Sequence, residues 1–110
     1  MPVRQVAFDW FKQGTKDENI LALLRPERGV TFFTRDRGFY RNEFCHRAYC
    51  LVILEVRNRE VAHYRKRFLR LPEFRTKASR SGLVVRVHPL GISWNPSRHK
   101  PEKHALWQMR

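Results

Sequence analysis

Apolar residues fall into runs with two different spacings, which indicates that strands and helices alternate along the chain. Residues 30–34 read Val-Thr-Phe-Phe-Thr, and residues 50–56 form a longer run of mainly aliphatic residues. β-branched and aromatic runs of this length are typical of buried strands, and a run that is apolar on both faces suits a central, parallel strand. Residues 3–8 predict a further short strand.

Two other segments have helical spacing. Thr15 and Glu18 match a capping box, and the leucine- and isoleucine-rich helix that they begin is expected to end at Pro26 and Gly29. A second helix is expected to begin at Asn58 and to stop or bend at Pro72. Its buried stripe recurs every three or four residues, at Val61, Tyr64, Phe68 and Leu71.

The last third of the chain predicts a basic loop, a hairpin and a tail. The loop covers residues 75–81, and the hairpin strands are residues 83–87 and 92–94, on either side of a Pro-Leu-Gly turn. This order of elements predicts an α/β domain over residues 1–95, with a mainly parallel sheet and an antiparallel C-terminal hairpin. Residues 96–110 are predicted to form a basic, irregular tail.

Length and composition limit the class of protein. A chain of 110 residues with 42% hydrophobic residues suits one domain with one core. Neither a long apolar run nor a signal-peptide pattern occurs, so we expect no membrane contact and a cytoplasmic location. The two cysteines, Cys45 and Cys50, are too few for a disulfide framework, and with His46 they match no zinc-binding pattern.

The positive charge is large and uneven. The chain carries a net charge of +13. Residues 1–55 hold nine Lys and Arg against seven Asp and Glu, a net +2, whereas residues 56–110 hold fourteen against three, a net +11. This excess predicts a polyanionic partner, and RNA is the first expectation because cations that neutralise phosphates release counterions.

Basic and aromatic side chains are the expected contacts with RNA. Tyr40, Trp94 and Trp107 could stack on bases, although Trp94 alternates with Ile92 and so suits the core better. The expected phosphate contacts in the second half of the chain are Arg65, Lys66, Arg67, Arg70, Arg75, Lys77 and Arg80.

Two carboxylates are predicted to meet at one edge of the sheet. Asp36 follows the strand that ends at Thr34, and Asp17 lies in the first turn of the first helix. Ligands of α/β sheets bind at the carboxyl ends of the strands, and helices begin at the same edge. Carboxylate oxygens are preferred ligands of Mg²⁺, which can generate hydroxide for attack on a phosphodiester. Asp17 and Asp36 are therefore candidate metal ligands.

The sequence Thr34-Arg35-Asp36-Arg37-Gly38-Phe39 resembles the Thr-x-Asp-x-x-Phe motif of PIN and PIN-like nucleases. Asp17-Glu18-Asn19-Ile20-Leu21 resembles the acidic helix start that precedes this motif in those families. The match covers residues 3–56. It implies a small three-layer PIN-like fold, with the family's first strand and its carboxylate missing before residue 3.

The resemblance also implies an activity. PIN-like domains are typically Mg²⁺- or Mn²⁺-dependent ribonucleases, and many are toxins whose partner is an antitoxin protein. By this resemblance Asp17 and Asp36 would bind the metal, and the Thr34 hydroxyl would orient Asp36 or water. Arg35 and Arg37, on either side of Asp36, are further candidate contacts with RNA. A missing strand would leave a sheet edge open to a second copy of the chain, in a homodimer.

Alternatives remain open at each of these residues. Asp36 followed by Gly38 can serve only as a turn, and Asp17 can serve only to stabilise a helix N-terminus. The five histidines are scattered with no metal-ligand spacing, so we expect no acid–base role for them. The functional hypotheses are a metal-dependent endoribonuclease, a catalytically degenerate RNA-binding module, and a component of a ribonucleoprotein complex.

Overall fold

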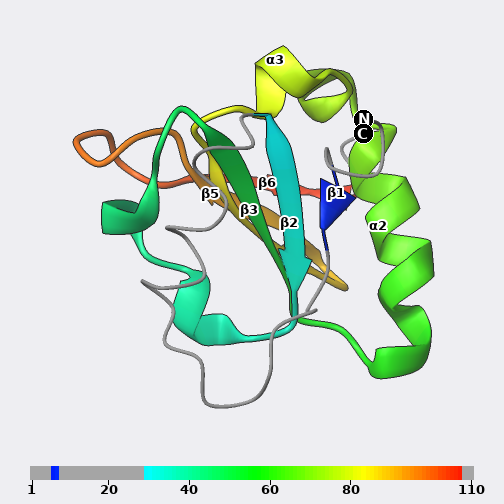
Figure 1. Ribbon diagram of the computed structural model, residues 1–110. Helices are drawn as coiled ribbons and strands as arrows, with labels where there is room; N and C mark the ends of the chain where they lie inside the picture. Colours follow the sequence, from blue (N-terminus) through cyan, green and yellow to red (C-terminus); the bar gives the residue numbers. More distant parts are fainter. Residues whose placement is uncertain (1–5, 8–28, 108–110) are drawn as a thin grey trace.

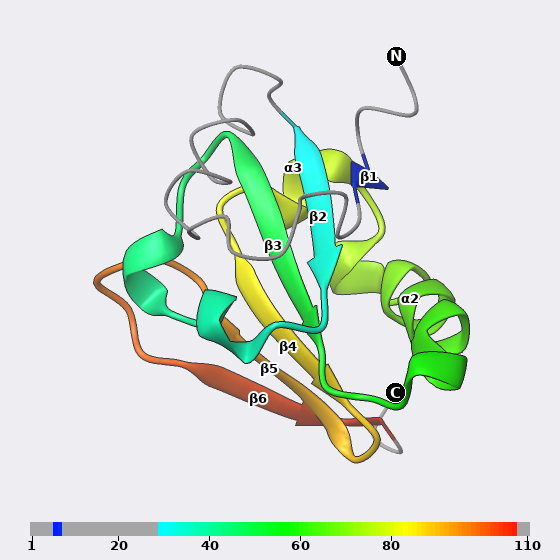
Figure 2. The same cartoon turned by 60° about the horizontal axis from the view of Figure 1, so that its bottom comes forward.

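A computed structural model describes residues 6–7 and 29–107 of the chain. Figure 1 shows the fold, and Figure 2 shows that its strands form one mixed sheet in the sequential order β1-β2-β3-β4-β5-β6. The strands are β1 (Val6–Ala7), β2 (Val30–Thr34), β3 (Tyr49–Leu54), β4 (Val84–His88), β5 (Gly91–Asn95) and β6 (Lys103–Leu106). The α-helices among the described residues are α2 (Val61–Leu69) and α3 (Lys77–Arg80).

Short 3-10 turns complete the described part of the chain. Arg37–Phe39 and Asn42–Phe44 lie in the connection from β2 to β3. Asn58–Glu60 leads directly into α2, and Pro72–Phe74 follows it. Pro72 therefore lies beyond the end of α2, as its ring requires.

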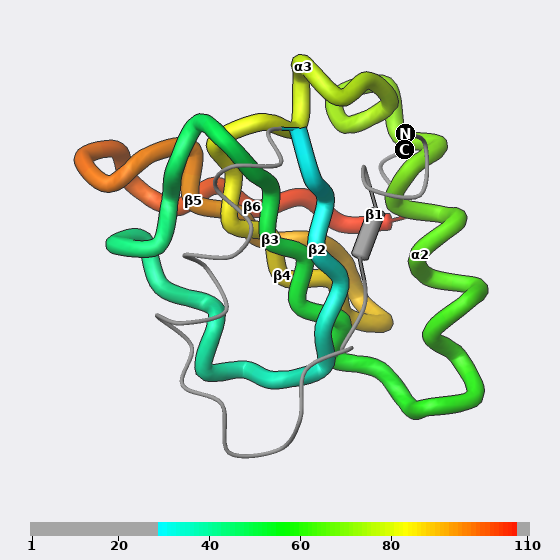
Figure 3. The backbone as a smooth tube through the Cα atoms, in the orientation of Figure 1, coloured from blue at the N-terminus to red at the C-terminus, as the bar shows by residue number. Residues whose placement is uncertain are grey.

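The predicted central strand organises the fold. Every residue of β2 and of β3 is buried, so both faces of these strands need a cover. The β2–β3 connection covers one face, and the β3–β4 connection covers the other (Figure 3). The two covers pack two separate hydrophobic clusters against opposite faces.

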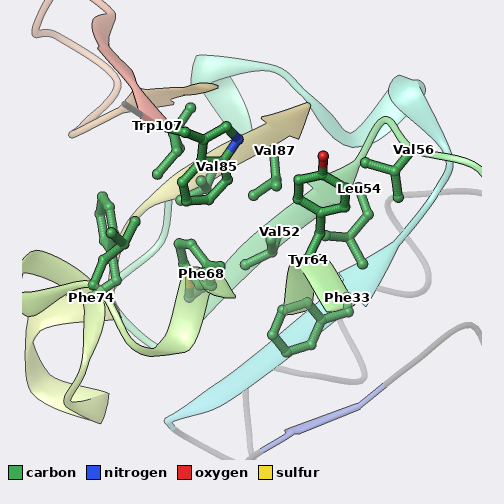
Figure 4. Packing of buried hydrophobic residues seen from close by; sticks show 13 residues of the cluster. Phe33, Val52, Leu54, Val56, Tyr64, Phe68, Phe74, Val85, Val87 and Trp107 are labelled. Atoms are coloured by element: carbon green, nitrogen blue, oxygen red, sulfur yellow. The ribbon is translucent and has the colours of Figure 1, made fainter. Parts of the chain in front are cut away.

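The larger cover is α2 with the turn that follows it. Tyr64, Phe68 and Leu71 are buried as the helical stripe predicts, and Val61 is partly buried. They pack on Phe33, Val52 and Leu54 with Val85, Val87 and Trp107, a group that we call the α2 cluster (Figure 4). Burying each of these side chains stabilises the fold by about 1.5–3 kcal/mol.

The opposite face has a cover without an α-helix. Phe39 and Phe44 from the β2–β3 connection pack on Phe32, Leu51 and Ile53. Phe39 lies edge-on to Phe32, with ring centroids 5.5 Å apart. We call this group the connection cluster; it also contains Val30, Cys45, Ala48, Tyr49 and Val84.

The two crossovers therefore have opposite hands. With β2, β3 and β4 parallel and in sequential order, two crossovers of one hand would lie on the same face. Here they lie on opposite faces, so one is left-handed, which is rare because twisted strands favour right-handed crossovers. This topology is not evident from the pattern of apolar residues.

The prediction of a three-layer PIN-like fold with a mainly parallel sheet is wrong. Apart from the two-residue strand β1, two strand pairs are parallel (β2–β3 and β3–β4) and two are antiparallel (β4–β5 and β5–β6). The described part of the chain also has few helices, and only α2 forms a long layer on the sheet (Figure 2).

The C-terminal segment also differs from its prediction. The hairpin is present, but residues 96–110 are not wholly irregular, because β6 pairs antiparallel with β5. Trp107 anchors the end of β6, since its Nε1 donates to the His88 carbonyl at 2.7 Å. The predicted helix that begins at Thr15 lies outside the described residues.

Cys45 and Cys50 are both free and buried. In the described segments no helix is long and apolar enough to cross a membrane.

Gly91 provides a test of the β5–β6 pairing. A Cβ atom at this position would overlap the Ala105 carbonyl oxygen and lie 3.1 Å from the Cα atom of Leu106. We expect Gly91→Ala to lower the free energy of unfolding by about 1–3 kcal/mol, measured by denaturant unfolding. Leu90→Ala, in the same turn and at a residue that is 74% exposed, is the matched control. Equal stability of the two variants would contradict the pairing.

Candidate nucleic-acid interface

An open pocket of about 380 Å³ lies where the parallel strands end. Arg35 follows β2, Glu55 to Arg57 follow β3, and Pro89 follows β4. Ligands of α/β sheets bind at this edge because the loops that leave the parallel strands meet there. We call this site the arginine pocket.

Arginines dominate the charge of the pocket. Its lining holds three of them, Arg35, Arg37 and Arg57. Arg35 Nε donates to the Val56 carbonyl at 3.1 Å, which holds this guanidinium beside the pocket. Guanidinium groups suit phosphate because their planar donors match two of its oxygens.

The two glutamates of the pocket already have partners. Glu55 Oε2 lies 3.7 Å from Arg86 Nε and 4.0 Å from Arg37 Nε. Glu60 Oε1 accepts from the backbone N–H of Arg57 at 3.0 Å, at the turn that begins α2. The carboxylates therefore offset only part of the arginine charge, and the pocket keeps a cationic character.

Asp36 lies beside this pocket in a turn. Its Oδ1 accepts from the Gly38 N–H at 2.9 Å, and its own N–H donates to Thr34 Oγ1 at 3.1 Å. Thr34 is fully buried and Asp36 is exposed, so the hydroxyl fixes the backbone and the carboxylate faces outward. The hydrogen bond within the turn therefore uses one of the two carboxylate oxygens of Asp36.

The predicted metal pair lies partly outside the described residues. Asp17 is among residues 8–28, so its distance from Asp36 is not tested. Across residues 6–7 and 29–107, no three His, Cys, Asp or Glu side chains gather closely enough to hold a metal ion. Binding of Mg²⁺ or Mn²⁺ by Asp17 and Asp36 stays a prediction.

The predicted phosphate contacts do not share one site. Lys77 lies beside Gly29, just before β2, whereas Arg35 and Arg37 follow the other end of that strand. Figure 1 shows α3 at the opposite end of β2 from the arrowhead that marks the carboxyl end of this strand. Of the remaining contacts, the exposed ones are Lys66, Arg70 and Arg75 and the half-buried ones are Arg65 and Arg67.

Arg80 is not available to RNA. The residue is 7% exposed, and its Nε donates to Thr31 Oγ1 at 2.9 Å. Its Nη1 donates to the carbonyls of Phe74 and Arg75 at 2.9 and 3.0 Å. The prediction of a phosphate contact here is wrong, because these bonds use the guanidinium to join α3 to the sheet.

The tryptophans are also used inside the protein. Trp107 is 6% exposed, and the Arg67 guanidinium lies 4.4 Å from its ring centroid. Trp94 is edge-on to Phe74, with centroids 5.2 Å apart. Of the three aromatic residues predicted to stack on bases, Tyr40 and Trp94 are both half-buried, and Trp94 packs against the α2 cluster.

A second group of polar side chains lies on the sheet beside the arginine pocket. Cross-strand register places Arg86, Ser93 and His104 in one row across β4, β5 and β6. We call this group the sheet-face cluster; its members are Tyr40, Arg86, His88, Ser93, Glu102 and His104. The sequence gives one sign of it, since Arg86 and His88 alternate with buried valines along β4.

His88 reports the electrostatics of this group. Partial burial lowers the pKa of His88 below its ordinary value, and the positive charge of Arg86 and the ring of His104 act in the same direction. The Glu55 carboxylate opposes them. His88 therefore favours the neutral form, which can accept a proton.

This pKa shift predicts a pH-dependent stability. Because His88 binds a proton less tightly in the folded chain than in the unfolded chain, protonation favours unfolding. We expect the free energy of unfolding of wild type to fall relative to that of His88→Gln as the pH falls through the ordinary histidine pKa of about 6.5. At higher pH the difference in free energy of unfolding between the two proteins should be constant. Denaturant unfolding of both proteins between pH 5 and pH 8 measures this. A difference that does not vary with pH would contradict the shift.

Comparison with known proteins found no family model, no curated protein and no solved structure that matches this chain. The resemblance to PIN-like nucleases thus stays a prediction from the short motifs alone.

Proposed function

We propose that this protein binds single-stranded RNA, with the backbone phosphates held at the arginine pocket. The observation that carries the proposal is the convergence of Arg35, Arg37 and Arg57 at the carboxyl ends of the parallel strands. The net charge of +13 supplies the long-range attraction that brings a polyanion to this surface.

The shape of the surface favours a single strand over a duplex. The pocket opens beside the sheet-face cluster, since Glu55 lines the pocket and pairs with Arg86 of the cluster. A flexible strand can place one phosphate in the pocket and its neighbours across the sheet face. Tyr40, half-buried at this face, offers a ring for base stacking.

Neutralising two pocket arginines tests the binding site. We expect Arg37→Gln with Arg57→Gln to weaken binding about tenfold through loss of charge-assisted contacts. The slope of log K against log salt should become shallower by about 1.4, for two single-strand phosphates. Fluorescence anisotropy with a labelled RNA oligonucleotide at several salt concentrations measures both.

The matched control removes the same charge elsewhere. Arg47 and Lys100 are exposed, and Arg47 precedes β3, away from the carboxyl ends of the parallel strands. Arg47→Gln with Lys100→Gln should change the salt slope much less. Equal losses in both double variants would show a diffuse charge effect and contradict a binding site at the pocket.

A second candidate function is metal-dependent cleavage of RNA. The observation that favours it is the exposed carboxylate of Asp36, directly after β2 and beside Arg35 of the arginine pocket. A divalent ion held by Asp36 would lie beside the arginine pocket, within reach of a phosphate bound there; Asp17, the other predicted ligand, lies outside the described residues. Such an ion would supply hydroxide and stabilise the charge that develops on the phosphate.

Asp36→Asn tests this function with little change in structure. The asparagine oxygen can still accept from the Gly38 N–H, so the turn is kept while the charge is lost. We expect cleavage that depends on Mg²⁺ or Mn²⁺ to fall to the rate seen without metal. A labelled single-stranded RNA, incubated with each protein with and without metal, measures it. Equal metal-dependent cleavage by both proteins would contradict the assignment.

A further inference from the structure

The sheet-face cluster is a connected network of ionisable side chains. Ser93 Oγ lies 3.0 Å from His104 Nδ1, and His104 Nε2 lies 3.4 Å from Glu102 Oε1. The Tyr40 hydroxyl donates to the other Glu102 oxygen. These contacts join the β2–β3 connection to β5 and to the start of β6.

Arg86 continues the network toward the arginine pocket. Its guanidinium carbon lies 5.5 Å from the Tyr40 ring centroid, and its Nε is 3.7 Å from Glu55 Oε2. This Nε is buried and makes no hydrogen bond among the described residues. His88, two residues along β4 on the same face, interacts with Arg86, Glu55 and His104.

These residues occupy positions where the sheet could have continued its apolar core. On the same face, β2 and β3 present Phe32, Leu51 and Ile53 to the connection cluster. His88 is an ionisable group with a lowered pKa at such a position, beside a pocket, which is a mark of functional sites.

Ser93, His104 and Glu102 lie in the chemical order of a catalytic triad, with Ser93 as the nucleophile. The geometry excludes that role for Ser93. Ser93 is 2% exposed, so a substrate cannot reach its Oγ for nucleophilic attack. Ser93 instead acts as a positioning residue that fixes one ring nitrogen of His104. The side chain of His104 is 66% exposed, so the ring can meet a ligand on the sheet face.

We propose that the sheet-face cluster cleaves bound RNA without a metal ion, by acid–base catalysis through His88 and His104 with Arg86 at the phosphate. The proposal rests on the RNA binding proposed above. It differs from the expectation from the sequence that the histidines have no acid–base role. The substrate is the phosphodiester of a ribonucleotide strand whose neighbouring phosphate lies in the arginine pocket.

The step balances with groups that the protein and the substrate supply. Neutral His88 accepts the proton of the ribose 2′-hydroxyl, and the 2′-oxygen forms a bond to phosphorus. The bond from phosphorus to the 5′-oxygen breaks, and the His104 ring, protonated on both nitrogens, donates its Nε2 proton, which otherwise faces Glu102, to that leaving oxygen. The products are a 2′,3′-cyclic phosphate and a 5′-hydroxyl.

Two other residues support this step. The Arg86 guanidinium neutralises the charge that grows on the non-bridging oxygens as the 2′-oxygen adds. When the His104 ring is protonated, it pairs with the Glu102 carboxylate, and this pairing holds the ring in place. Protons move from substrate to His88 and from His104 to product, so solvent exchange restores both rings after each turnover.

The test uses the full chain and a labelled single-stranded RNA in EDTA. Wild type should release fragments with 2′,3′-cyclic phosphate ends, and an oligonucleotide of the same sequence with 2′-deoxyribose should stay intact. His104→Gln and His88→Gln should each slow cleavage about a hundredfold or more. RNA affinity, measured by anisotropy, should stay within about threefold of wild type.

His99→Gln is the matched control, because His99 is exposed in the β5–β6 loop and belongs to neither site. It should cleave like wild type. The deoxyribose substrate needs no variant, so it keeps the test decisive even where a histidine variant fails to fold.

The outcomes separate the two proposals. Absence of RNA binding by wild type would overturn the proposed function and this inference together. Binding without cleavage in EDTA would overturn this inference alone. Equal cleavage of the deoxyribose strand, or full cleavage by folded His104→Gln and His88→Gln, would do the same. The last result would also reveal a contaminating nuclease.

Discussion

The burial of β3 on both faces is the constraint on which the rest of the structure depends. All six residues of this strand are buried, so neither face can be left to water. The connection from β2 covers one face with Phe39 and Phe44, and α2 covers the other with Tyr64 and Phe68. The opposite hands of the two crossovers follow from this need, because each face receives its own connection.

The same arrangement leaves one part of the sheet polar. The connection cluster ends near the start of β4, and beyond it the same face carries Arg86, Ser93 and His104. The arginine pocket adjoins this region through Glu55. The proposed RNA binding at the strand ends and the proposed proton transfer on the sheet would therefore share one continuous surface.

Local patterns predicted local structure well and long-range pairing poorly. The strand at residues 30–34, the stripe from Val61 to Leu71 and the hairpin turn follow from side-chain spacing, which neighbouring residues determine. The strand β6 was missed because its residues are mostly exposed and only its pairing with β5 defines it.

The candidate site shows the same difference. Asp36 and the flanking arginines were located because the end of β2 is clear in the sequence. His104 was not, because it joins Ser93 only once β6 is in place. Arg80 was misassigned since a charge run does not show which cation turns inward.

The most direct test of a single RNA-binding surface is an NMR titration of the isotope-labelled protein with a 2′-O-methyl single-stranded RNA, which binds but cannot be cleaved by its own 2′-oxygen. The account predicts saturable shifts of backbone amides in residues 35–40, 54–57, 86–91 and 102–104. Saturable shifts centred instead on Arg47 and residues 97–100 would contradict it.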